Sequence, residues 1–500
     1  MFSIRTTKTS SKATAVQVVR YDQRKTVVVK HIGSAHNDDE LKLFKKAGRD
    51  WIKQVTKQID LFPQEKLSES ASKILVVNKS QYLGERYTFF LEVIRRLFHQ
   101  FGFNRINDPL LLDLVVVRLL EPTSKLKSLD LLAKRFGLYY SRSYLYRRLP
   151  LWLDLKDKIE AKIILIAKKH FNFDFKLVFY DVTTLYFESF KDDSLRKCGF
   201  SKDSKFNQPQ ILIGLLVNRD GFPIGYEIFT GNTFEGHTLL PAILKLRKKH
   251  RIKNLTVVAD AAMISLANIN QLVDHQLNYI VGARLSNIQA DQIKTISQKL
   301  NQNNGKTICL NTNYGRLICD FSKKRCHKDK SEMNKQLEKA MMAIRQPAKI
   351  TKRYKFIKQS KKSRPELNQP LIDKAKLLLG IKGHYTNLER VSHQTIIRQY
   401  RNLWQVEKSF RIAKSDLEIR PVYHWKQKAV KTHILLCFMA LSIAKYIEIK
   451  TGKSLQKVVE ELKAVADARI LNKLTGEEIV MRSNLTKEVK QVLSALNLSY

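Results

Sequence analysis

Two aspartates far apart in the chain stand where a carboxylate is either costly or well placed for chemistry. Asp181 lies inside the apolar run 177–184, where an ionised carboxylate costs free energy unless a cation pairs with it. Asp260 ends the β-branched run 255–259, and the carboxyl ends of strands in open α/β sheets are common ligand sites. Simpler explanations remain open for both: Asp181 facing water on an edge strand, and Asp260 capping the following helix.

A third acidic candidate, Glu407, lies in a segment whose spacing predicts a single helix over residues 392–418. Tyr400 and Lys414 lie seven residues before and after Glu407, so the three side chains would share one helix face. The same face would carry Trp404 and Arg411. A carboxylate flanked by hydrogen-bond donors and cations is typical of a site that holds phosphate groups. The alternative is an ordinary amphipathic helix with a surface pair between Glu407 and Arg411.

These three carboxylates would repel one another and raise each other's pKa unless cations lay between them. Oxygen ligands suit Mg²⁺, and Mn²⁺ could substitute for it. Two such ions, about 3.5 to 4 Å apart, can activate a hydroxyl and stabilise the leaving oxygen of an in-line displacement at phosphorus. Asp181, Asp260 and Glu407 are therefore the candidate catalytic residues and metal ligands.

The charge of the chain points to a polyanionic partner. Lysine and arginine number 90 against 46 acidic residues, for a net charge of +44 spread over the whole length. Such a charge is self-repelling without a partner such as nucleic acid. With 44% hydrophobic residues in a chain of 500, we expect several globular domains.

The sequence predicts neither a membrane anchor nor a secreted protein. The longest apolar run, residues 434–444, is too short to span a bilayer, and residues 1–20 lack the apolar core of a secretory signal. Five cysteines without paired short spacings fit neither a disulfide framework nor a standard zinc site. We therefore expect a cytoplasmic protein.

The first third of the chain predicts a β-containing region and connector over residues 1–85, followed by a helical domain over residues 86–173. Inside that domain, residues 131–135, Gly137 and residues 141–149 resemble a DNA-binding helix-turn-helix. Its second helix would present Arg142, Arg147 and Arg148 to DNA. A helical hairpin with basic surface residues remains the alternative.

The rest of the chain predicts an α/β fold. Three strands with hairpin connections and then two α/β units, over residues 174–285, are the element order of a ribonuclease-H-like core with a mixed five-stranded sheet. Residues 286–390 are lysine-rich and predict an insertion domain. Residues 391–450 would complete the core and carry Glu407, and residues 451–500 predict a helical tail.

At these residues the chain resembles the transposases of bacterial insertion sequences that carry an Asp-Asp-Glu triad. The signature of one group is Tyr, two residues, Arg, three residues, Glu, six residues, Lys, with an insertion before the glutamate. Tyr400, Glu407 and Lys414 match this pattern, but Leu403 occupies the arginine position. That phosphate contact therefore does not carry over. The nearest possible substitutes are Arg401 and Arg411.

Other stretches resemble the same family, and the resemblance extends from about residue 87 to residue 449. These stretches are residues 180–187, 199–203, 214–216, 221–227, 231–232 and 420–425. The resemblance implies that Tyr400 and Lys414 hold phosphates near the cleaved strand and that Trp404 packs near the DNA end. Trp404 in the protein core is the alternative. Arg411 on the same face is a further expected DNA contact.

The function implied is that of a transposase that binds the terminal inverted repeats of its element. It would cleave the element ends and transfer their 3′ hydroxyls into target DNA. The resemblance also implies a homodimer that pairs two ends, acting on double-stranded DNA of a bacterial nucleoid. Two alternatives remain: a non-catalytic basic DNA-binding protein, and a ribonuclease-H-like nuclease without strand transfer.

Overall fold

The computed structural model describes residues 2–9, 13–22, 25–56, 80–188, 191–200, 207–263, 265–345, 354–360, 363–473 and 476–499. These residues form two units, one within 1–81 and 472–477, the other within 82–471 and 478–500. Parts of three predicted features lie outside the described residues. They are residues 23–24 of the first predicted turn, residues 57–79 of the connector, and residues 201–203 of one family-like stretch.

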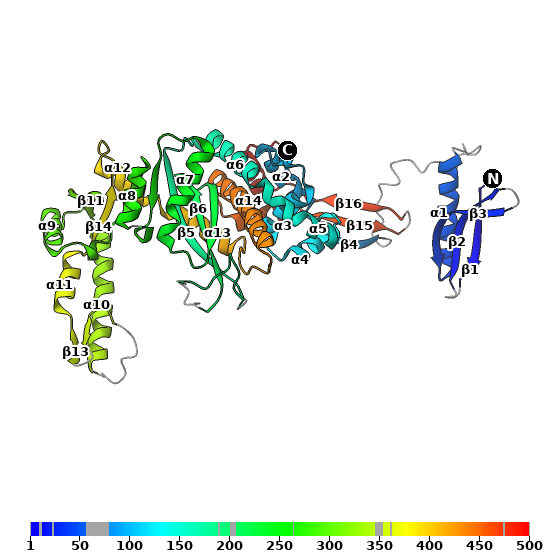
Figure 1. Cartoon of the computed structure of the whole chain (residues 1–500). Coiled ribbons are helices and arrows are strands. Elements are labelled where there is room, and N and C mark those ends of the chain that lie inside the picture. The colour runs from blue at the N-terminus through cyan, green and yellow to red at the C-terminus, as the bar shows by residue number, and fades with distance from the viewer. Residues whose placement is uncertain are drawn as a thin grey trace. The chain divides into compact units, whose positions relative to one another are not determined.

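The smaller unit is an antiparallel sheet with one helix packed against it (Figure 1). The described strands, in the order β1-β2-β3, are β1 (Phe2–Lys8), β2 (Thr14–Asp22) and β3 (Lys25–Ala35), and the helix is α1 (Asp38–Thr56). The alternation that predicted strands here reflects one buried face, since Val16 and Val18 have no exposed surface.

The larger unit begins with the predicted helical region. Its elements are α2 (Thr88–Gln100), η2 (Phe103–Ile106), α3 (Pro109–Leu120), α4 (Lys125–Leu131), η3 (Leu132–Phe136), α5 (Arg142–Arg148), η4 (Leu149–Leu155) and α6 (Lys156–Phe171). Gly137 follows η3 with a φ of +69°, where glycine carries no steric penalty. A turn then leads into α5.

Asp108 links the start of α3 to the segment that follows α5. Its carboxylate is 2% exposed and accepts hydrogen bonds from the Leu111 N–H at 3.0 Å, from Arg148 Nε at 3.0 Å and from Trp152 Nε1 at 2.7 Å. Arg148, predicted to bind DNA, is thus committed to a buried carboxylate inside the fold, because that carboxylate needs a counter-charge. Arg142 and Arg147 of the same helix are exposed.

Among the described residues, eight strands form one mixed sheet in the order β10-β11-β14-β9-β8-β5-β6-β7 (Figure 1). The strands are β5 (Leu177–Tyr186), β6 (Gln210–Val217), β7 (Pro223–Thr230), β8 (Thr256–Ala259), β9 (Asn278–Gly282), β10 (Thr307–Thr312), β11 (Gly315–Phe321) and β14 (Ile381–Thr386). β5, β8 and β9 are parallel, and the other pairs are antiparallel. The predicted α/β class is confirmed.

The predicted count of five strands is wrong, because part of residues 286–390 extends the sheet. β14 pairs with β9 and β11 pairs with β14, so the edge of β9 is covered by further strands instead of facing solvent. The remaining elements of this segment are η7 (Leu285–Asn287), α9 (Ala290–Leu300), α10 (Lys323–Arg345), β12 (Ile357–Ser360), β13 (Ser363–Leu367) and α11 (Gln369–Leu377). Among them, Ala340, Phe356 and Ile372 form a small separate core.

The single helix predicted over residues 392–418 is two helices, α12 (His393–Arg401) and α13 (Trp404–Ser415). The chain tightens between them. The N–H groups of Leu403 and Val406 bond to carbonyls only three residues earlier, those of Tyr400 and Leu403, both at 3.0 Å. The break interrupts the helical register, so seven-residue spacing no longer places Tyr400 and Glu407 on one continuous helix face.

Helices pack on the strands and continue to the end of the chain. They are η5 (Glu235–His237), α7 (Leu239–His250), η6 (Ala261–Met263), α8 (Leu266–Asp274), α14 (Gln427–Thr451), α15 (Leu455–Lys463) and α16 (Lys487–Ala495). Tyr226 of β7 packs on Phe438 of α14, with ring centroids 4.7 Å apart. In the described part of the chain, α14 alone is long and apolar enough to cross a bilayer. Because 89% of its apolar window is buried, it has the surroundings of a core helix.

The predicted helical tail also contains strands. β15 (Asp467–Asn472) and β16 (Glu478–Arg482) pair with each other, and the order β16-β15-β4 joins them to β4 (Ser80–Arg86). Residues near the two ends of the chain therefore share a sheet, a long-range pairing that local periodicity does not show.

We expect Asp108→Ala to destabilise the protein by about 2 to 4 kcal/mol. The change removes the cap of α3, worth about 1 kcal/mol, and leaves the buried Trp152 N–H without its acceptor, a cost of about 1 to 3 kcal/mol. Chemical denaturation of the full chain measures the loss. Asp154→Ala, on an exposed aspartate of η4, is the matched control and should change stability by less than about 0.5 kcal/mol. Equal stability of the two variants would contradict the role of Asp108.

Candidate active site

Asp181 and Asp260 lie at equivalent positions of two paired strands. β5 and β8 run parallel, and their last paired residues are Tyr180 and Ala259. The residue that follows Tyr180 is Asp181, within β5, and the residue that follows Ala259 is Asp260, just after β8. Adjacent strands lie about 4.8 Å apart, so the parallel register brings these backbones side by side.

Glu407 shares a pocket with Asp181. It lies in the first turn of α13, is exposed, and lines an open pocket of about 570 Å³ together with Asp181. The helix is held on the sheet by its apolar face, where Phe410 packs beside Thr183 of β5. The pocket also receives three cationic side chains: Arg411, Lys414 and Arg420. The structure therefore joins two of the predicted acids with the predicted basic residues of α13.

Asp260 is linked to the same region through Tyr400. The Tyr400 hydroxyl donates to Asp260 Oδ1 at 3.3 Å, and the residue is only 5% exposed. Burial raises the pKa of Tyr400, and the negative charges of Asp260 and Glu407 raise it further. The hydroxyl therefore stays protonated and lies within the electrostatic field of both acids. A buried hydroxyl bonded to Asp260 is better placed to orient that carboxylate than to contact DNA phosphates.

The ring of Tyr400 is held between residues that the sequence patterns did not single out. His384 of β14 lies on it at a centroid distance of 4.3 Å, and Lys382 Nζ lies 4.7 Å from the ring centre. Gly282, at the end of β9, leaves room for the hydroxyl, since a Cβ there would lie 2.3 Å from it. Sequence reasoning missed Lys382 and His384 because they fall in the segment read as an insertion.

A second cluster of charged side chains contains Arg401, one of the two residues proposed to substitute for the arginine of the family pattern. Arg401 donates to Asp320 Oδ2 at 3.3 Å, and His384 Nε2 lies 3.7 Å from the other oxygen of Asp320. Burial alone would raise the pKa of Asp320, but His384 and Arg401 outweigh it and lower the pKa. Arg401 is thus paired within the protein, whereas Arg411 lines the pocket of Asp181 and Glu407.

Exposed aromatic side chains lie on α13 and in the segment that follows it. Trp404 is 49% exposed, and Lys408 Nζ lies 5.8 Å from its ring, so the alternative that placed Trp404 in the core is wrong. Tyr423 and Trp425 are 69% and 65% exposed in the segment that follows α13. Large exposed rings beside cations are typical of surfaces that contact nucleic acid.

The carboxylates fit divalent cations by chemistry, but they are not drawn together into a ligand set. Oxygen donors within one strand, at the end of its neighbour and on a helix suit a hard cation such as Mg²⁺. Within the described residues, however, no group of three or more His, Cys, Asp or Glu side chains is close enough to hold an ion. Asp260 is engaged by Tyr400, so binding a shared cation would require that carboxylate to turn toward Asp181 and Glu407.

Comparison with known proteins identifies the class of enzyme. Residues 173–443, more than half of the chain, match the family model of the transposase DDE domain, and the chain belongs to that family. The family implies an enzyme that cleaves DNA and transfers its strands, and such enzymes generally use divalent metal ions. The match includes all three candidate acids and the strands and helices that carry them.

Two further comparisons concern solved structures and curated protein sequences. A solved structure, described as the cryo-EM structure of the piggyBac transposase synaptic complex with hairpin DNA, aligns with 64% of this chain at 10% identity and a TM-score of 0.34. The alignment covers 57% of that protein, so the chain matches little more than half of its length. No curated protein sequence matches this chain significantly.

We expect Gly282→Ala to destabilise the protein through Tyr400. The new methyl group would lie 2.3 Å from the Tyr400 hydroxyl, and overpacking of this kind costs about 1 to 3 kcal/mol. In a Tyr400→Phe background the hydroxyl is absent, and the same change should cost less than about 1 kcal/mol. Thermal or chemical unfolding of the four proteins measures this coupling.

Gly225→Ala in β7 is the matched control for that cycle. Its nearest neighbour would be Leu216 Cδ1 at 3.6 Å, an ordinary contact, so no coupling to Tyr400 is expected. Equal costs of Gly282→Ala with and without the Tyr400 hydroxyl would show that the close approach of Gly282 and Tyr400 does not hold.

Proposed function

We propose that this chain is the transposase of a bacterial insertion sequence, with Asp181, Asp260 and Glu407 as ligands of two Mg²⁺ ions. It binds the terminal inverted repeats, cleaves the element ends and transfers their 3′ hydroxyls into target DNA. The observation that carries the proposal is the register of β5 and β8, which aligns the two aspartates, while α13 places Glu407 on the pocket of Asp181.

The sheet topology supports a ribonuclease-H-like core for this enzyme. Five consecutive strands have the order β9-β8-β5-β6-β7 and end at the edge strand β7; three antiparallel strands come first in the chain, and two parallel strands follow on the other side of β5. This strand order brings the two aspartates near each other. After β7 the chain crosses back through α7 to the other side of β5, where β8 pairs with β5. β10, β11 and β14 then belong to the segment inserted before the glutamate.

The side chains around the pocket suit a DNA strand with a cleavable phosphate. Lys414 and Arg411 supply positive charge beside Glu407, and Trp404 offers an exposed ring for the DNA end. Leu403 is only 6% exposed and cannot reach a phosphate. Arg401 contacts Asp320 instead of lining the pocket, so Arg411 is the better candidate to replace the arginine of the family signature.

The protein residues would position substrate and cations before chemistry begins. Tyr400 orients Asp260, and the cations of α13 neutralise phosphate charge near Asp181 and Glu407. Two bound divalent ions would supply activation of the attacking hydroxyl and stabilisation of the leaving oxygen. Arg142 and Arg147 of α5 offer a second basic surface for end recognition. We place this activity in the bacterial cytoplasm, in a homodimer that pairs two ends.

We expect Asp181→Ala, Asp260→Ala and Glu407→Ala to abolish Mg²⁺-dependent nicking of an end-containing duplex while largely preserving binding to it. Each change removes one ligand of the ions but no basic side chain. Gel analysis of nicking and anisotropy of binding provide the two measurements. Nicking by any one variant at the wild-type rate would remove that residue from the triad.

Two outcomes would replace the proposal with the alternatives. Binding by the wild type without nicking in either Mg²⁺ or Mn²⁺ indicates a non-catalytic DNA-binding protein. Nicking without joining of precut ends to target DNA indicates a nuclease. Asp154→Ala, an exposed aspartate of η4, is the matched control and should nick and join as the wild type does.

We expect Lys414→Ala to reduce the salt dependence of DNA binding. Loss of one phosphate contact on duplex DNA lowers the slope of log K against log salt by about 0.9. Anisotropy titrations over a range of salt concentrations measure the slope. Lys169→Ala, on an exposed lysine of α6, removes the same charge and should leave the slope near that of the wild type. Equal slopes for wild type and Lys414→Ala would place Lys414 away from the phosphates.

A further inference from the structure

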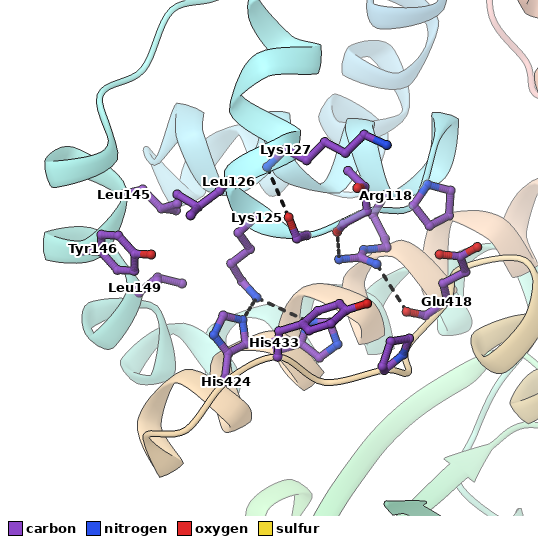
Figure 2. Close-up of a pocket in the computed structure, with 15 residues that line it drawn as sticks. Arg118, Lys125, Leu126, Lys127, Leu145, Tyr146, Leu149, Glu418, His424 and His433 are labelled. Carbon is purple, nitrogen blue, oxygen red and sulfur yellow. Dashed lines mark hydrogen bonds between the residues drawn. The ribbon is translucent and has the colours of Figure 1, made fainter. Parts of the chain in front are cut away.

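A second pocket lies next to the candidate active site, between the helical region and α14 (Figure 2). Its volume is about 720 Å³, and α3, α4, η4, α14 and the segment after α13 contribute to it. Glu418 and Pro421 line this pocket, whereas Arg420 lines the pocket of Asp181 and Glu407. The segment 418–421 therefore contributes side chains to both pockets.

Three basic side chains in this pocket are almost fully buried. Arg118 and Lys125 are each 5% exposed, and His433 is 4% exposed. Figure 2 shows the Lys125 amine between two imidazoles: its Nζ lies 2.6 Å from His424 Nε2 and 3.2 Å from His433 Nδ1. Arg118 donates to backbone carbonyls, among them that of Thr123 at 2.8 Å.

These buried cations lack an acidic partner in the described part of the chain. No ion pair joins Arg118 or Lys125 to a carboxylate there, although Glu418 lines the pocket. Buried charges in proteins are ordinarily paired, because an unpaired one loses its hydration without compensation. The guanidinium of Arg118 remains charged regardless, so the pocket carries positive charge that an anion would balance.

The surroundings of Lys125 make its charge responsive to such an anion. The pKa of Lys125 is lowered to about 7, mainly by burial; Cys437 opposes this shift and the positive charge of Arg118 adds to it. The other titratable groups facing it are His424 and His433, whose pKa values are lowered first by burial and then by Lys125 itself. Lys127 and Glu418 line the pocket farther out.

We propose that this pocket binds a backbone phosphate of the DNA strand that also occupies the candidate active site, with Lys125 and Arg118 as its cationic partners. The inference rests on the proposed function, since it takes DNA as the ligand. A phosphate supplies the missing negative charge and can accept charge-assisted hydrogen bonds from Lys125 and Arg118. Exposed rings of Tyr146 and Tyr423, also lining the pocket, offer apolar contact to the adjoining sugar and base.

The test uses the full chain and a labelled duplex taken from the DNA that flanks the reading frame. Lys125→Met removes the charge, Lys125→Arg keeps a charge that does not titrate, and Lys169→Met on exposed α6 is the matched control. Below the pKa of about 7, Lys125→Met should lower the salt slope of binding by about 0.9, while the control and Lys125→Arg keep the wild-type slope.

The pH dependence gives a second readout. Bound phosphate raises the pKa of Lys125, so the complex takes up a proton when it forms above pH 7. Wild-type affinity should therefore fall by up to about tenfold per pH unit above that value, and the fall should be absent in Lys125→Arg. If Lys125→Met proves unfolded by thermal melting, this comparison of wild type with Lys125→Arg still decides the matter.

Three outcomes would overturn the proposal. One is a wild-type salt slope in folded Lys125→Met, and another is the same pH dependence in Lys125→Arg as in the wild type. The third is protection of the wild type against heat by inorganic phosphate, lost in Lys125→Met, with an unchanged DNA slope, which assigns the pocket to free phosphate. Nicking by the wild type in any of these cases leaves the proposed function standing.

Discussion

The parallel pairing of β5 with β8 is the constraint on which the candidate site depends. Because the two strands run parallel with Tyr180 opposite Ala259, the next residues, one within β5 and one just after β8, have neighbouring backbones. Both are aspartates. Placing two carboxylates together is unfavourable unless positive charge lies nearby, and α13 contributes Arg411 and Lys414 to the pocket of Asp181. The strand register and the nearby positive charges therefore both support a candidate site at this place in the sheet.

The break between α12 and α13 places Tyr400 and Glu407 on separate helices. α13 is free to hold Glu407 on the pocket, while α12 buries Tyr400 against β9 and β14 and brings its hydroxyl to Asp260. The strands that extend the sheet supply Lys382 and His384 around that ring. A segment that looks like an insertion therefore also supports the second aspartate, and the site depends on the sheet as a whole.

Positive charge in this protein is of two kinds. Much of the net charge of +44 lies on exposed side chains such as Arg142 and Arg147, where water screens it. Arg118 and Lys125 are buried beside the loop that follows α13, and water screens them far less. Buried charge is costly in the free protein, and a bound anion would recover part of that cost. The helical region and the segment after α13 thus share a buried, positively charged pocket.

The sequence by itself determined the α/β class, the positions of the five strands β5 to β9, the buried apolar runs and the residue types that could bind metal and phosphate, because periodicity and composition are local properties. It also indicated that Asp181 and Asp260 end or interrupt apolar strands. Tertiary structure decided which strands are neighbours, that β14 continues the sheet, that Arg148 serves Asp108, and that Lys125 is buried between two histidines. These facts arise from contacts between residues distant in the chain, and no local pattern records them.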